Sequence, residues 1–327
     1  MSDVVNSPSP SPYSPTEGAR PAFERWRPAI AIAALLVLAV APSFIYPMFL
    51  MKLMCFALFA ASLNLLVAQA GLLSFGHAAF FGIGAYAAAS LARFAGLDPL
   101  LCILLAMLAA ACFGAFMGLL AIRRKGIYFA MITLAIAQLL YFIVHKIPAS
   151  GGEDGLHEVP RGMLFGLIDL NVAHNIYAFI LVLFALGMWF LWRIVNSPFG
   201  HIMQAIAAHE VRMTSLGYNI RGYKVAVFVM SAAIAGMAGA MNALTFQFAT
   251  LHDLSFHLSG EAILMVLIGG VGTYFGPLVG AAVIVLLQSF LATSEFPAPV
   301  AVGLVFILCV LLFRRGVVGE LVARLRP

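Results

Sequence analysis

The chain has 327 residues, of which 63% are hydrophobic and only 9% are charged, and its formal net charge is +5. A soluble domain carries roughly 25% charged residues, so a surface this poor in charge indicates that most of the molecule faces lipid. The basic residues lie at the ends of apolar runs and form no separate basic domain. This pattern favours charge that sets membrane topology and gives no reason to expect nucleic acid as a partner.

The apolar runs predict an all-α integral membrane protein, a polytopic bundle of about eight to ten transmembrane helices. The runs are continuous, whereas the strands of a membrane barrel would alternate apolar and polar residues. Residues 1–27 are rich in Pro and Ser and predict a disordered tail. The run at 28–50 contains small residues that resemble a signal cleavage site near residue 41. Because the run continues beyond that point, we expect a retained helix.

Nine further spans are expected along the chain. They are 53–70, 72–92, 99–122, 126–144, 175–192, 225–247, 261–273, 276–293 and 298–313. The transmembrane domain would therefore cover 28–315, followed by a C-terminal tail at 316–327. Very short glycine-containing turns join 53–70 to 72–92 and 261–273 to 276–293. Each of these junctions is equally compatible with a broken or re-entrant helix.

The distribution of basic residues predicts that both termini are cytoplasmic. If every span crosses, fourteen of the 18 basic residues lie inside and four lie outside. The four outside are Lys52, Arg93, Lys146 and Arg161. This topology leaves one long external loop at 145–174 and one long cytoplasmic segment at 193–224. Soluble partners must dock on these two segments or on the tails.

Several kinds of chemistry are disfavoured by what the spans contain. Among the acidic residues only Glu261 approaches the hydrocarbon, whereas carriers coupled to protons or sodium usually keep ionisable groups near the midplane. The chain contains no Gly-Lys-Ser/Thr phosphate loop, so any ATP hydrolysis would belong to a partner. Motifs of intramembrane enzymes are missing, and the four cysteines lie singly in apolar spans. We therefore expect no catalytic site, metal or cofactor.

The cytoplasmic segment contains signals for a short helix. Ser197-Pro198 predicts its start, because serine caps a helix and proline fits its first turn. Residues 217–219, Gly-Tyr-Asn, predict its end. One side of the helix would carry Ile202, Ile206 and Met213. By periodicity alone this amphipathic helix could lie along the membrane surface or bind a protein partner.

Six segments, in chain order, resemble the permeases of branched-chain amino-acid ATP-binding cassette (ABC) importers. They are GLLSFGHAAFFGIGAY at 71–86, GIYFAMITLA at 126–135, GGEDGL at 151–156, parts of 197–219, AGMAGA at 235–240 and GGVGTYFGP at 269–277. The resemblance covers about residues 50–315 and is to the LivM-type subunit rather than to its shorter partner permease.

The resemblance implies a multi-pass permease subunit in a bacterial inner membrane. It would translocate branched-chain or related small amino acids, with ATP-binding subunits, a second homologous permease and a periplasmic solute-binding protein as partners. The architecture also resembles permeases for urea or short amides. A secondary carrier or channel that acts without ATP is the other alternative.

The resemblance also implies that the segment at 193–224 couples the permease to its ATPase. The coupling residues would be Gly200, Ala205, Ile206, Glu210 and Gly217, with the glutamate in the helix that enters an ATPase groove. The family usually places arginines through this helix, whereas this chain has His201, Gln204 and alanines at 207–208. This departure leaves open how much charge contributes to docking.

Polar and glycine residues inside the spans are candidates for the substrate path. They are Gly76, His77, Thr133, Gln138, Asn242, Gly269, Gly270 and Gly272. Interhelical hydrogen bonds and close helix packing are the alternative roles for such residues. The glycines at 269–272 could break their helix, so that an exposed helix terminus would meet the charged groups of a zwitterion.

The external loop offers a second set of candidates, Gly152, Glu153, Asp154 and Arg161. They form either a flexible polar turn or, as the family resemblance implies, a docking surface for the periplasmic binding protein.

Overall fold

The computed structural model describes residues 36–291, together with 300, 303, 304, 307, 308, 316–318 and 320. The tail predicted at 1–27 and most of the span predicted at 298–313 lie outside the described residues. The helices are α2 Pro47–Ala70, α3 Ala78–Ala95, α4 Pro99–Ala121, α5 Ile127–Lys146, α6 Ala173–Val195, α7 Pro198–Ala208, α8 Glu210–Ser215, α9 Ile220–Phe246, α10 Phe256–Gly269 and α11 Gly276–Leu291.

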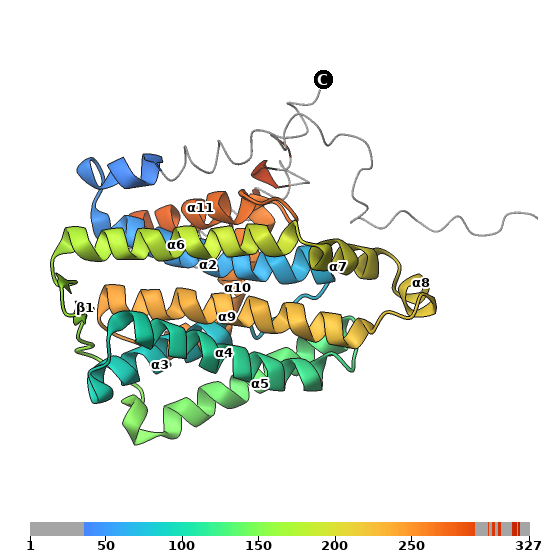
Figure 1. The fold of residues 1–327 in the computed structure, drawn as a ribbon, viewed down its shortest axis with the longest axis horizontal. Coiled ribbons are helices and arrows are strands. Elements are labelled where there is room, and N and C mark those ends of the chain that lie inside the picture. The colour runs from blue at the N-terminus through green and yellow to red at the C-terminus, as the bar shows by residue number, and fades with distance from the viewer. Residues whose placement is uncertain are drawn as a thin grey trace, which may run out of the picture.

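Short elements complete the described fold. Three 3₁₀ helices are η1 Ala41–Ser43, η2 Pro148–Ser150 and η3 Leu251–Leu254. The strands β1 Met163–Leu164 and β2 Ile168–Asp169 pair as an antiparallel hairpin. The long helices run side by side, with α7 and α8 at one end of the bundle and the hairpin at the other (Figure 1).

The all-α membrane fold predicted from the sequence is confirmed. Within the described residues, six helices are long and apolar enough to cross a membrane: α2, α3, α4, α5, α6 and α9. α10 and α11 are apolar but have only 14 and 16 residues, fewer than the roughly 20 that a straight crossing needs. These eight helices correspond to the eight spans predicted between residues 53 and 293.

The first predicted boundary is wrong. The helical turn over residues 36–40 gives way to η1, and α2 begins at Pro47 rather than at residue 53. Proline lacks an N–H group and fits the first turn of a helix, so Pro42 and Pro47 separate two helical segments within a run that is apolar throughout. The single run predicted at 28–50 is therefore interrupted.

Helix α9 forms the centre of the bundle and packs against α2, α3 and α4. Its glycines let the backbones meet directly. A Cβ atom on Gly239 would overlap the carbonyl oxygen of Phe81 in α3, and one on Gly84 would overlap that of Gly236. These glycines thus serve close helix packing, which membrane helices need because lipid supplies no hydrophobic drive between them.

Non-helical segments precede α3, which begins in the buried interior, and α10, whose first two residues are exposed. α3 begins at Ala78 rather than at residue 72, because residues 71–77 leave α2 and return into the bundle. α10 follows η3, and the N–H of Ala78 donates to Oγ of its Ser259 at 2.9 Å. The chain is broken again at 270–275 before α11 begins. Both weak junctions predicted from the sequence are therefore breaks.

Candidate functional site

A hydrogen-bonded cluster in the interior joins four helices. His77, just before α3, places its Nε2 atom 2.9 Å from Oγ of Ser62 in α2. Ser231 of α9 donates to the carbonyl oxygen of Ser62 at 2.6 Å. The bond from Ala78 to Ser259 adds α10 to this group. Since all these side chains are buried, the cluster fixes where α2, α3, α9 and α10 meet.

His77 is fully buried in an aromatic environment. Its ring stacks on Phe59 with a centroid distance of 5.5 Å and meets the edge of Phe80 at 5.5 Å. Among the described residues, Nδ1 of His77 and Oγ of Ser74 have no hydrogen-bond partner. Buried polar atoms are normally paired, so this segment retains unused hydrogen-bonding capacity beside the first break.

The structure brings some of the predicted path residues together and separates others. Gly76 lies against α5, where a Cβ atom on it would overlap the carbonyl oxygen of Thr133. The hydroxyl of Thr133 is already satisfied, because it donates to the carbonyl of the residue three positions earlier at 2.8 Å. Gln138 is half-buried further along α5. Asn242 is buried in α9, with its Oδ1 unpaired among the described residues.

The break between α10 and α11 is held by Asn64 of α2. Gly270 and Gly272 have φ angles of +108° and +81°, which favour glycine. The N–H of Gly272 donates to Oδ1 of Asn64 at 3.0 Å, and Nδ2 of Asn64 donates to the carbonyl oxygen of Thr273 at 3.0 Å. These backbone groups are thus paired with a side chain. Sequence reasoning missed Asn64, although a carboxamide inside an apolar run was the signal available.

An apolar groove of about 140 Å³ lies between α2 and α10. It is lined by Leu63, Val67, Gly71, Leu73, Ile263, Val266, Leu267 and Val271. The segments 71–77 and 270–275 both contribute to this lining, so the groove borders both breaks. Since a dry engineered cavity of about 150 Å³ can hold benzene, the groove has room for a small aliphatic group.

At the other candidate site, α7 starts as predicted. Oγ of Ser197 accepts a hydrogen bond from the N–H of Gly200 at 3.3 Å, and proline is the first helical residue. Met203 and Ile206 are buried where α7 packs against α2 and α6. A Cβ atom on Gly200 would overlap backbone carbonyls at the end of α6. α7 is amphipathic, as predicted, but of the predicted apolar side only Ile206 is buried on it, since Ile202 is half-buried and Met213 lies outside this helix.

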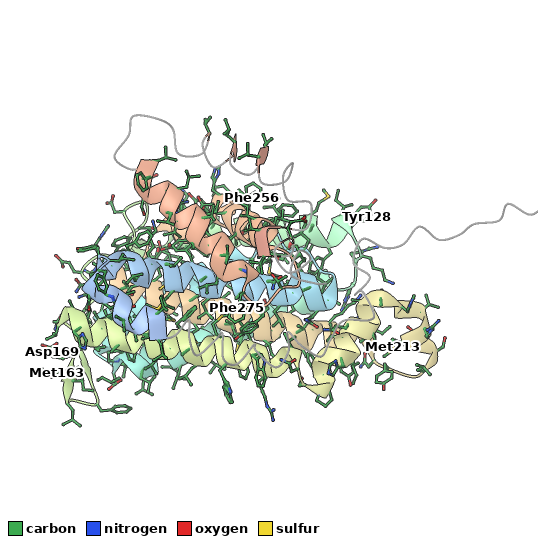
Figure 2. The ribbon with its side chains drawn as sticks, turned by 90° about the horizontal axis from the view of Figure 1, so that it is seen from above. Tyr128, Met163, Asp169, Met213, Phe256 and Phe275 are labelled. Atoms are coloured by element: carbon green, nitrogen blue, oxygen red, sulfur yellow. The ribbon has the colours of Figure 1, made fainter. Side chains whose placement is uncertain are left out.

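The segment contains two helices where the sequence predicted one. α7 ends at Ala208, His209 has an extended backbone with φ −144°, and α8 begins at Glu210. The chain then turns at Gly217, with φ +85°, before α9. Figure 1 shows α8 at the extreme end of the bundle. Figure 2 places Met213 of α8 at this end and Met163 and Asp169 of the hairpin at the opposite one.

Glu210 is bound on two sides. Its Oε1 lies 3.0 Å from Nζ of Lys125 in the α4–α5 connection, and its Oε2 lies 3.3 Å from Nζ of Lys224 in α9. Burial raises the pKa of Glu210, but the hydrogen bonds and charges of the two lysines outweigh burial and hold the pKa below its ordinary value of 4.5. The carboxylate is therefore charged at neutral pH.

This depressed pKa predicts a pH dependence. The stabilisation from the two ion pairs is fully present above about pH 4.5 and is lost as the pH falls through the lower folded pKa. Because the side chain of Lys125 is 75% exposed, we expect at most about 1 kcal/mol. The measurement is the difference in thermal unfolding between the wild type and Glu210→Gln from about pH 7 to pH 3. A difference that does not shrink at low pH would contradict the expectation.

The predicted docking residues of the loop 145–174 separate into two groups. Residues 152–154 form a turn in which Glu153 and Asp154 are exposed and Gly152 has φ +59°. Arg161 instead bonds the end of α9, donating from Nη2 to the carbonyl of Thr245 at 2.7 Å and from Nε to that of Leu244 at 3.4 Å. Its guanidinium group is therefore hydrogen-bonded to the backbone of α9.

Six apolar helices long enough to cross a membrane, within the residues that the structure describes, define a multi-pass membrane protein. A family model described as the branched-chain amino acid transport system / permease component matches residues 45–314, and the chain belongs to this family. The resemblance found in the sequence is confirmed.

Similar proteins carry related names. The chain is 29% identical over 281 residues to the high-affinity branched-chain amino acid transport system permease protein LivM of Escherichia coli (strain K12), covering 78% of this chain and 66% of that protein. It is 24% identical over 257 residues to the probable branched-chain amino acid transport permease protein LivM of Methanocaldococcus jannaschii, covering 69% and 70%. The chain thus spans slightly less than two thirds of the Escherichia coli relative. No solved structure matches the chain.

Proposed function

We propose that this chain is the permease subunit of an ATP-driven importer that moves branched-chain or related small amino acids across a bacterial inner membrane. The family match over residues 45–314 carries the proposal, because it covers the crossing helices, both breaks and the α7–α8 segment. The substrates named for the similar proteins favour branched-chain amino acids. ATP hydrolysis would be supplied by partner subunits.

The orientation follows from the basic residues at the two ends of the bundle. The end that carries α7 and α8 holds Arg123, Arg124, Lys125, Arg193, Arg212, Arg221 and Lys224, whereas the hairpin end holds Arg93, Lys146 and Arg161. Basic residues accumulate on the cytoplasmic side of membrane proteins. We place α7 and α8 in the cytoplasm, both termini on the same side and the exposed turn at 152–154 outside, where a binding protein would dock.

The docking surface for the ATP-binding subunits would be formed by α8. Val211 and Leu216 are 82% and 65% exposed, beside charged residues and beyond the ends of the crossing helices. Exposed apolar side chains in such a position indicate a protein contact rather than a lipid contact. In this arrangement Gly200 and Ile206 hold α7 against the bundle, half-buried Ala205 lies at its edge, and Gly217 allows the return to α9.

The substrate path would use the groove between α2 and α10. Its apolar lining suits an aliphatic side chain, and the segment 71–77, which contributes Gly71 and Leu73 to that lining, also carries the buried unpaired atoms of Ser74 and His77. Gly76 lies within the break at 71–77 and contacts Thr133, whereas Gly270 and Gly272 lie within the break at 270–275, which follows Gly269. A second homologous permease subunit would close the open side of the groove.

A double substitution tests the docking surface. Val211→Asp with Leu216→Asp should reduce the ATP-binding subunits that copurify with the permease about tenfold, because two carboxylates would be desolvated in the contact. The matched control is Leu167→Asp, which alters a side chain 88% exposed in the hairpin at the opposite end. Equal loss in both variants, or no loss in the double variant, would contradict this docking surface.

A transport assay tests the cargo. Membranes that contain the whole importer should take up radiolabelled leucine when ATP is supplied, and excess isoleucine or valine should compete with it. Uptake of urea in place of leucine would show that the chain serves the amide alternative. Uptake that persists without ATP would instead support a secondary carrier.

A further inference from the structure

We propose that Glu210 is an internal transmission link, which carries movement of α8 to α9 and to the α4–α5 connection instead of contacting an ATP-binding subunit itself. The inference rests on the proposed function, in which α8 receives those subunits. It assigns Glu210 a positioning role within its own chain.

The contacts of α8 support this role. Within α8, all of whose residues the structure describes, Met213 alone is buried, and the extended backbone at His209 separates α8 from α7. The carboxylate of Glu210 bridges the ammonium groups of Lys125 and Lys224. Among the described residues, these ion pairs are the charged connections between α8 and the rest of the bundle. A displacement of α8 would therefore pull on or break the ion pairs of Glu210 with both lysines.

The direction of the side chain separates Glu210 from the docking surface. Adjacent residues on a helix point about 100° apart. Val211 is 82% exposed, whereas the side chain of Glu210 is only 31% exposed and both of its oxygens face lysines. A partner that contacts Val211 and Leu216 would thus press on α8 from outside while Glu210 holds its inner side.

The two lysines lead to the helices that border the inner breaks. Lys224, with a side chain only 12% exposed, lies in the second turn of α9, which packs against α2 and α3. Lys125 lies two residues before α5, whose Thr133 contacts Gly76 at the first break. A chain of packed or bonded elements of this kind can carry coupling between distant sites. Glu210 connects the docking helix to both routes.

Uptake and subunit association, measured on the same membranes, test the inference. In the complete importer, Glu210→Gln should lower ATP-driven leucine uptake about fivefold, near the low end of the usual range of coupling between sites. The amount of copurifying ATP-binding subunits should fall far less than in the Val211/Leu216 double variant. The control is Glu158→Gln, an exposed acidic residue in the external loop.

Exchange of the charges separates coupling from simple loss of structure. E210K and K224E should each impair uptake, and the double variant E210K/K224E should recover part of it, because an opposite pair again joins α8 to α9 while Lys125 loses its partner. A zero-length carbodiimide, which joins a carboxylate to an amine as an amide and itself leaves as a urea, should join Glu210 to Lys125 or Lys224 in wild-type membranes. This second measurement needs no variant to fold.

The outcomes that overturn the inference differ from those that overturn the proposed function. If Glu210→Gln removes the ATP-binding subunits as fully as the Val211/Leu216 double variant, Glu210 is a docking residue and the link is wrong. Unchanged uptake in Glu210→Gln, no recovery in the charge exchange, or no carbodiimide product would also overturn the link. Failure of wild-type permease to copurify with ATP-binding subunits would overturn the proposed function and the link together.

Discussion

Replacing Gly239 with valine is expected to abolish the folded bundle. A Cβ atom at this position would overlap the carbonyl oxygen of Phe81, which belongs to the backbone of α3 and cannot rotate away. α3 and α9 would have to separate, with loss of the packing that drives helix association in lipid. We expect a destabilisation of about 3–5 kcal/mol or more, because severe overpacking is one of the few mechanisms that cause effects this large.

The measurement is the fraction of protein that elutes as a single species from membranes solubilised in mild detergent, together with its unfolding temperature. Gly260→Ala is the matched control, because Gly260 is also a helical glycine but its Cβ would meet no atom within 4 Å. That control should be neutral or more stable by up to about 1 kcal/mol, since alanine favours helix. Equal stability of Gly239→Val and wild type would show that α3 and α9 do not approach this closely.

The second large effect is expected for Asn64→Leu. The substitution keeps a side chain of similar size but leaves the N–H of Gly272 and the carbonyl of Thr273 without their partner. Gly272 is exposed and Thr273 is half-buried, so each lost hydrogen bond is expected to cost about 0.5–1.5 kcal/mol, and two are lost here. The segment 270–275 should then lose its fixed conformation, which loosens the junction of α10 and α11.

Thermal unfolding in detergent or nanodiscs measures this effect. Gln138→Leu removes a carboxamide from another apolar helix, where its side chain makes no hydrogen bond with other described residues, and should leave the unfolding temperature nearly unchanged. A decrease for Gln138→Leu equal to that for Asn64→Leu would show that lost polarity, and not the bonds to Gly272 and Thr273, causes the effect.

Local signals predicted much of the fold. The spans expected at 99–122, 126–144, 175–192 and 225–247 correspond to α4, α5, α6 and α9 within five residues at each end. Continuous apolar runs of this length report directly on contact with lipid. The start of α7 was predictable for a similar reason, because Ser197 and Pro198 act on the backbone within one turn.

The missed features depend on residues far apart in the chain. Hydropathy could not decide between a helix and a break at 71–77, because the segment is as apolar as its neighbours. Its path is fixed by the contacts of His77 with Ser62 and of Ala78 with Ser259, the latter 181 positions away. The two lysines that bind Glu210 likewise come from separate elements, and no periodicity within 197–219 could indicate them.

Helix α9 has both of its ends fastened by long side chains. Its 27 residues extend for about 40 Å, roughly the full thickness of a bilayer with its headgroups. Arg161 donates a hydrogen bond to a carbonyl oxygen in the last turn of α9, and Lys224, near the first turn of α9, forms an ion pair with Glu210. A displacement of the loop that carries Arg161 would therefore be transmitted along the single helix α9 to Glu210 and α8. This route crosses neither of the two breaks, at 71–77 and at 270–275.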